Sequence, residues 1–150
     1  MMNQSEFEAL MADTTKRISG DISWDEDEDH SPAVEFRVEV TSQIGYTLFI
    51  KGRYHPVAQK LTYALIHQSL GRIYALDVGK EHRNPSGENV GEKHKHRWNK
   101  ELRDKEAYVP EDITAPLTDP VGVWQQFCIE LRITHNGVMN TPPLLQTELF

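Results

Sequence analysis

The stretch VEFRVEVT, residues 34–41, decides the fold of this 150-residue chain. Apolar and charged side chains alternate along it, which is the period of a strand with one buried face. A second alternating run, residues 46–51, follows a turn at Gly45, so we expect the two strands to pair antiparallel. Two further β-rich runs, residues 61–68 and 72–78, are joined at Ser69-Leu70-Gly71. The sequence therefore predicts a central antiparallel β-meander, with a helix over residues 58–68 as an alternative.

Two helices are expected to flank the meander. Ser5 to Lys16 places apolar residues at helical spacing, and Ser5 with Glu8 forms a capping box. Val121 to Ile133 follows a capping Asp119, and its Trp and Phe residues form one apolar stripe that should pack on the sheet. The expected fold is one α+β domain, with an N-terminal helix and a C-terminal helix packed on the sheet.

Length and composition exclude several classes of protein. A chain of 150 residues matches one ordinary domain. Cys128 is the only cysteine, so no disulfide can form within the chain. No apolar stretch is long enough to span a bilayer, and no signal-like run begins the chain. We therefore expect a cytoplasmic protein that has no membrane function.

An internal acidic loop and the C-terminal tail are expected to be irregular. Residues 21–31 hold a dense acidic run, and like charges this close together favour a solvated loop. Asn136-Gly137 and Thr141-Pro142-Pro143 indicate an irregular tail over residues 136–150. The acidic run suggests one non-catalytic function, in which Asp25 to Asp29 imitates phosphates and occupies the nucleic-acid groove of another protein.

The middle of the chain carries the candidate chemistry. Residues 51–105 hold twelve of the sixteen Lys and Arg residues, although the whole chain has a net charge of −7. Within this segment, Asn84-Pro85-Ser86-Gly87 has the composition of a reverse turn. If residues 93–98 are extended, His94, His96 and Trp98 point to one face. A hairpin would then bring His82 near His94 or His96.

One reading of the three histidines is a metal site. Converging neutral imidazoles suit zinc or another transition metal, with Asp77, Glu81 or water as further ligands. The absence of a second cysteine argues against a closed structural zinc site and favours an open one.

The other reading is metal-independent RNA cleavage. His82 with His94 or His96 would be the general acid and base, because the pKa of histidine lies near neutrality. Asn84 would position the substrate as a donor. The substrate-binding residues would be Arg83 or Arg97 as the phosphate clamp and Trp98, or Tyr74, as a stacking surface for a base.

The motifs also resemble those of a known group of proteins. The run His82-x-Asn84-Pro85-x-Gly87, followed by His94-x-His96 and Asp104 to Tyr108, resembles an uncharacterised family of small bacterial proteins, often found on prophages or beside toxin–antitoxin genes. The resemblance implies either an RNase-like toxin or an anti-defence protein. Glu106 stands where that family places an aromatic residue. The sequence thus predicts a nucleic-acid-acting protein, foremost a toxin-type endoribonuclease, whose partner is RNA. The alternatives are the acidic protein, whose partner is a nucleic-acid-binding protein, and the metal-binding protein.

Overall fold

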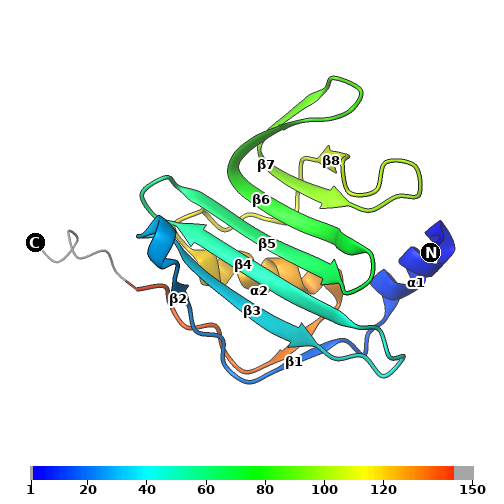
Figure 1. The fold of residues 1–150 in the computed structure, drawn as a ribbon, viewed down its shortest axis with the longest axis horizontal. Helices are drawn as coiled ribbons and strands as arrows, with labels where there is room; N and C mark the ends of the chain where they lie inside the picture. The colour runs from blue at the N-terminus through cyan, green and yellow to red at the C-terminus, as the bar shows by residue number, and fades with distance from the viewer. Residues whose placement is uncertain (1, 144–150) are drawn as a thin grey trace, which may run out of the picture.

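The structure is a computed structural model, and it describes residues 2–143. Seven of its strands form one antiparallel sheet in the order β2-β3-β4-β5-β6-β7-β8 (Figure 1). Their bounds are β2 (Asp25–Glu26), β3 (Val34–Val40), β4 (Leu48–His55), β5 (Lys60–His67), β6 (Gly71–Arg83), β7 (Asn89–Arg97) and β8 (Ala107–Tyr108). Because every neighbour in the sheet is also a neighbour in sequence, the predicted meander is confirmed, and the helical alternative for residues 58–68 is wrong.

Two helices complete the α+β domain, as predicted. Helix α1 (Gln4–Ala12) lies at one end of the sheet, and α2 (Pro120–Leu131) lies behind strands β3 to β5 in Figure 1. The ring of Phe127 on α2 lies 5.6 Å from the rings of both Tyr63 and Tyr74 on the sheet. The apolar stripe of α2 therefore forms the main core, and no helix of the described residues covers the opposite face of β3 to β5.

Helix α1 begins and ends earlier than the sequence predicts. Its N-cap is Asn3, whose side-chain oxygen accepts a hydrogen bond of 2.8 Å from the amide of Glu6, in place of the predicted Ser5. The helix ends at Ala12, because the ammonium of Lys16 folds back and donates to the carbonyl oxygens of Leu10 and Met11. These last carbonyls of the helix thus gain a partner inside the protein.

The acidic segment is more ordered than the predicted solvated loop. Asp25 and Glu26 pair with β3, and a 3-10 turn follows at Glu28–His30. Asp27 accepts a hydrogen bond of 2.7 Å from Arg53 on β4, so this carboxylate is tied to the sheet. Pairing with β3 and the guanidinium of Arg53 thus offset the repulsion between the carboxylates of this segment.

The C-terminal segment also gains structure. Strand β9 (Thr134–Asn136) pairs in parallel with β1 (Arg17–Ser19), and a bridge between Ile22 and Met139 continues the pairing. Within the predicted irregular tail, Asn136 and Met139 are therefore paired, and the last part, residues 144–150, lies outside the described residues. Among the described residues, no helix is both long enough and apolar enough to cross a membrane.

Candidate metal centre

The hairpin of β6 and β7 brings three histidines together. Asn84 to Gly87 forms its turn, closed by a hydrogen bond of 2.8 Å from the amide of Gly87 to the carbonyl of Asn84. The register of the hairpin shifts between Val78 and His82. As a result, the ring centroid of His82 lies 5.3 Å from that of His94 and 4.5 Å from that of His96. One ring nitrogen of each histidine lies within 4.8 Å of those of the other two.

A carboxylate from the neighbouring strand faces two of these rings. Asp77 on β6 is the cross-strand partner of His94 on β7, so the two side chains share a face of the sheet. Its Oδ2 lies 3.2 Å from Nε2 of His94 and 3.3 Å from Nε2 of His96. Its Oδ1 accepts a hydrogen bond of 2.7 Å from the hydroxyl of Thr62 on β5. The four groups thus form one polar cluster, which we call the histidine cluster: His82, His94, His96 and Asp77.

Each imidazole is oriented by a backbone carbonyl on its outer side. Nδ1 of His94 lies 3.0 Å from the oxygen of Gly91, and Nδ1 of His96 lies 2.7 Å from that of Asp104. Nε2 of His82 lies 2.8 Å from the oxygen of Lys105. Because a carbonyl oxygen can only accept, each of these outer nitrogens must carry a proton. In the neutral rings, the other nitrogen of each histidine is then a lone-pair donor.

The inner nitrogens of the rings and the carboxylate of Asp77 converge on a point that suits a cation. With neutral rings, the Nε2 lone pairs of His94 and His96 would face the lone pairs of the Asp77 carboxylate at hydrogen-bond distance, which is repulsive. Protonation of both rings would instead bury two cations whose centroids lie 4.9 Å apart. A divalent cation between the four groups removes both problems, and outer N–H bonds to carbonyls are the usual support of metal-bound histidines.

Burial makes the carboxylate dependent on its neighbours. Asp77 is 5% exposed, His94 1% and His96 4%, whereas His82 is half-buried. Burial alone would raise the pKa of Asp77, but a positive charge on the His94 and His96 side, together with the hydroxyl of Thr62, outweighs burial and holds that pKa far below its usual range. The carboxylate is therefore ionised at neutral pH, as a metal ligand must be.

The cluster opens to a small cavity of about 210 Å³. Charged residues of both signs line it besides the cluster: Arg72, Lys80, Glu81, Asp104 and Lys105. Arg72 donates to the carboxylate of Asp104, which fixes the segment whose carbonyls orient His96 and His82. The rim thus carries three cations and two carboxylates, and one of the cations, Arg72, is already paired with Asp104.

Asn84, predicted as a positioning donor for substrate, has a different role. Asn84 is buried. Its Nδ2 donates a hydrogen bond of 2.9 Å to the carbonyl oxygen of Ala107, and its Oδ1 accepts one of 2.8 Å from the backbone amide of Ala107. These two bonds hold β8 beside the hairpin. Because Asp104 and Lys105 lie two or three residues before Ala107, Asn84 helps to place the carbonyls that orient two of the histidines.

The predicted substrate-binding residues do not join the cluster. Arg83 donates 2.6 Å to the carbonyl of Gly87 within its own turn. Arg97 points to the face of β7 opposite His94 and His96, and its guanidinium donates a hydrogen bond of 2.9 Å to the carboxylate of Glu8 on α1. Trp98 lies just beyond β7, is 2% exposed and packs 5.4 Å from the ring of Phe7, so it offers no stacking surface. Sequence proximity suggested Arg83 and Arg97, and strand alternation suggested Trp98, but β7 ends at Arg97, just before Trp98.

One supporting residue, Thr62, was not apparent from the motif, whereas Asp77 was expected as a possible further ligand. Thr62 is distant in sequence and reaches the cluster only through the pairing of β5 with β6. Asp77 is the charged residue in the apolar run from Ile73 to Val78, and such a residue in a buried strand is the one signal that marks it.

Comparison with known proteins defines a family and no activity. No curated protein and no solved structure matches this chain. The sequence model of a family of unknown function, DUF6978, matches residues 2–133, a range that contains the histidine cluster. This chain therefore belongs to the DUF6978 family.

Proposed function

We propose that this protein binds a transition metal ion, zinc in the first place, through His82, His94, His96 and Asp77. The observation that carries the proposal is the orientation of the imidazoles. All three place a protonated nitrogen on a backbone carbonyl, and two of them direct the other nitrogen at one carboxylate oxygen.

The spacing of the ligand atoms supports zinc. Zinc–nitrogen bonds of 2.0 to 2.1 Å at tetrahedral angles separate neighbouring ligand atoms by about 3.3 Å. The two distances from Asp77 to His94 and His96, 3.2 and 3.3 Å, fit this separation, and one nitrogen from each of the three imidazoles lies within 4.8 Å of the other two. Imidazole is a donor that suits zinc, and zinc also accepts a carboxylate oxygen as a ligand.

The half-buried position of His82 favours an accessible metal over a closed structural site. The cavity beside the cluster leaves room for an added ligand, and zinc can expand to five ligands during reaction. His82, His94, His96 and Asp77 would hold the metal, which would supply Lewis-acid chemistry to a ligand in this cavity.

The endoribonuclease and the acidic binding protein stay predictions of the sequence, as do a prophage origin and a cytoplasmic location. The metal-independent reaction has less support than metal binding. Both ring nitrogens of His94 and His96 are engaged inside the protein, whereas a general acid or base must reach its substrate. For the acidic protein, one carboxylate of the proposed mimic, Asp27, is already paired with Arg53.

Elemental analysis tests the metal proposal directly. We expect the purified protein to carry one zinc per chain, and a His94→Ala, His96→Ala variant to lose it. The matched control is a His55→Ala, His67→Ala variant, because these histidines lie on β4 and β5 outside the cluster and accept only local amide hydrogen bonds. The control should keep the metal.

A second variant guards against a folding defect in the first. His82 is half-buried, so His82→Ala should fold and should weaken zinc binding about 100-fold in competition with a chelator. Zinc retained by the His94→Ala, His96→Ala protein would overturn the assignment, and so would a wild-type protein that binds no added zinc.

A further inference from the structure

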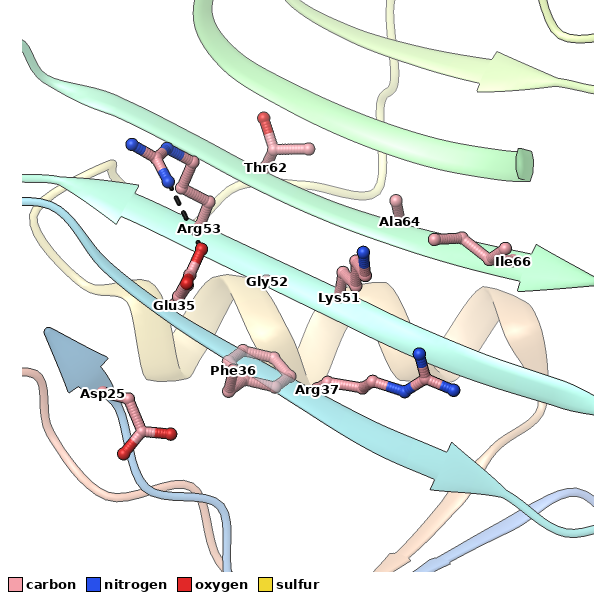
Figure 2. Close-up of a pocket in the computed structure, with 10 residues that line it drawn as sticks. All are labelled: Asp25, Glu35, Phe36, Arg37, Lys51, Gly52, Arg53, Thr62, Ala64 and Ile66. Carbon is pink, nitrogen blue, oxygen red and sulfur yellow. Dashed lines mark hydrogen bonds and ion pairs between the residues drawn. The ribbon is translucent and has the colours of Figure 1, made fainter. Parts of the chain in front are cut away.

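The face of the sheet opposite α2 carries a groove over strands β2 to β5. Its volume is about 480 Å³, within the usual range for small-molecule sites. Figure 2 shows Asp25 and Glu35 toward one end of this groove and Lys51 toward the other. Phe36 and Gly52 lie between these two ends. The groove and the cavity at the histidine cluster share no lining residue, so the groove is a separate site.

Carboxylates crowd one end of the groove. Asp25 on β2 is the cross-strand partner of Glu35 on β3, so two like charges lie directly opposite each other, which is unfavourable. One guanidinium nitrogen of Arg53 donates to Glu35 at 3.3 Å, and the same nitrogen donates to Asp27 at 2.7 Å. Among the described residues, the exposed carboxylate of Asp25 has no hydrogen bond or ion pair. This end therefore favours a cationic group of a ligand.

Cations stand at the other end of the groove. Lys51 on β4 is the cross-strand partner of Arg37 on β3, so two positive charges share this part of the face. Arg37 donates to Glu39 at 3.3 Å, and its guanidinium carbon lies 3.8 Å from the centroid of the Phe49 ring. Within residues 2–143, the exposed ammonium of Lys51 has no hydrogen bond or ion pair. This end therefore favours an anionic group of a ligand.

The surface between the two charged ends is apolar. Phe36 on β3 and its cross-strand partner Gly52 on β4 line the middle of the groove, and Gly52 contributes no side chain. Ala64, which is the cross-strand partner of Lys51, and Ile66 add apolar surface on β5 at the basic end. A ligand that fits this groove is therefore apolar between its two charged groups and beside its anionic group.

The separation of the two unpaired charges sets the length of the ligand. Asp25 and Lys51 lie two strands apart across the sheet and two residues apart along it. Strands are about 4.8 Å apart and rise about 3.4 Å per residue, so the two Cα atoms are separated by about 12 Å. An extended peptide spans about 3.4 Å per residue, so three residues cross most of this distance. The side chains of Asp25 and Lys51 can cover the rest.

We propose that this groove binds a short peptide with free termini. The amino terminus of the peptide lies against Asp25, its carboxyl terminus lies against Lys51, and the side chain of its last residue packs on Ala64 and Ile66. An ammonium and a carboxylate at opposite ends of an apolar chain match both the charges and the floor of the groove. The proposal is independent of the metal centre, because the two sites share no lining residue.

Calorimetric titration with the tripeptide Ala-Ala-Leu, whose last residue is apolar, tests the proposal. We expect this peptide to bind, and acetylation of its amino terminus or amidation of its carboxyl terminus to weaken binding about fivefold each, as for the loss of an exposed ion pair. Asp25→Asn should weaken binding of the free and the amidated peptide about fivefold and leave the acetylated peptide unchanged. Lys51→Gln should weaken binding of the free and the acetylated peptide and leave the amidated peptide unchanged.

Matched controls make the same charge changes elsewhere. Glu101→Gln and Lys100→Gln lie at exposed residues beyond β7, and each should change the affinity by less than about twofold. Equal losses in the groove variants and in these controls would overturn the proposal, as would a wild-type protein that binds no tripeptide. Equal affinity for the free and the amidated peptide would show a site for amines alone, and the peptide proposal would then be wrong.

Discussion

The hydroxyl of Thr62 donates a hydrogen bond of 2.7 Å to Oδ1 of Asp77, and the other carboxylate oxygen is left to face two imidazoles. One side chain of β5 therefore sets the rotation of the carboxylate on β6. Such supporting hydrogen bonds are part of a metal site, because they fix the direction of the ligand's lone pairs.

Loss of this hydrogen bond should weaken metal binding while the fold is kept. Thr62→Val preserves the shape of the side chain and removes the donor, so we expect zinc affinity to fall about tenfold in competition with a chelator. Thr134→Val, at an exposed position of β9, is the matched control. Equal zinc affinity in the two variants would show that Thr62 does not orient Asp77.

Asn84 should matter for stability and for the metal together. Asn84→Ala removes both hydrogen bonds to Ala107, and we expect unfolding in urea to require about 2 kcal/mol less free energy. Zinc affinity should also fall, because the carbonyls of Asp104 and Lys105 lose their support. The exposed Asn136→Ala is the control. A variant with wild-type stability and affinity would contradict this role.

The opposite face of β7 carries a buried ion pair. Lys95 is fully buried and donates to Glu130 on α2 and to both oxygens of Asp112. Glu130→Gln removes one charged partner of this buried ammonium, and Asp112 remains. We therefore expect a loss of about 2 kcal/mol in the free energy of unfolding at pH 7.

The same pair should contribute to acid sensitivity. Burial would raise the pKa of Glu130, but the hydrogen bond from Lys95 outweighs it and holds that pKa below its ordinary value of 4.5. The pKa of Glu130 is lower in the folded protein than in the unfolded chain. Its contribution to the free energy of unfolding is therefore complete above pH 4.5 and is lost as the pH falls through the pKa of the folded state. Urea unfolding should show that the free energy of unfolding falls less between pH 7 and pH 3 for Glu130→Gln than for the wild type. The exposed Glu111→Gln should follow the wild type, and an unchanged loss in Glu130→Gln would refute the assignment.

Gly52 is required by packing. A methyl group there would overlap the ring of Phe36, which packs edge-on against Trp24 and Trp124, so Gly52→Ala should destabilise the protein by about 2 kcal/mol. The clash is specific to the ring, and the substitution should cost about 1 kcal/mol less in a Phe36→Leu background. Equal costs in both backgrounds, measured by urea unfolding, would place the strain elsewhere.

The alternation of residues 34–41 and the stripe of α2 were sufficient to predict the meander and the helix on it. Both are patterns of burial repeated along a continuous segment, and burial of one face is the dominant local constraint on a strand or helix. The turn at Asn84 to Gly87 was readable for a similar reason, because its residues fit a reverse turn. Helix α1 was placed less well, since its first cap and its end depend on Asn3 and on the buried Lys16.

The cluster depended on contacts that no local pattern encodes. The sequence determined that His94 and His96 share a face of β7, because side chains alternate along a strand. Only the tertiary structure decided that Asp77 and Thr62 stand beside them, that carbonyls from residues 104 and 105 orient two rings, and that Arg97 and Trp98 point elsewhere. Strand register and the path of a returning loop fix these distances. Both are set by the packing of the whole sheet, in which residues far apart in sequence become neighbours.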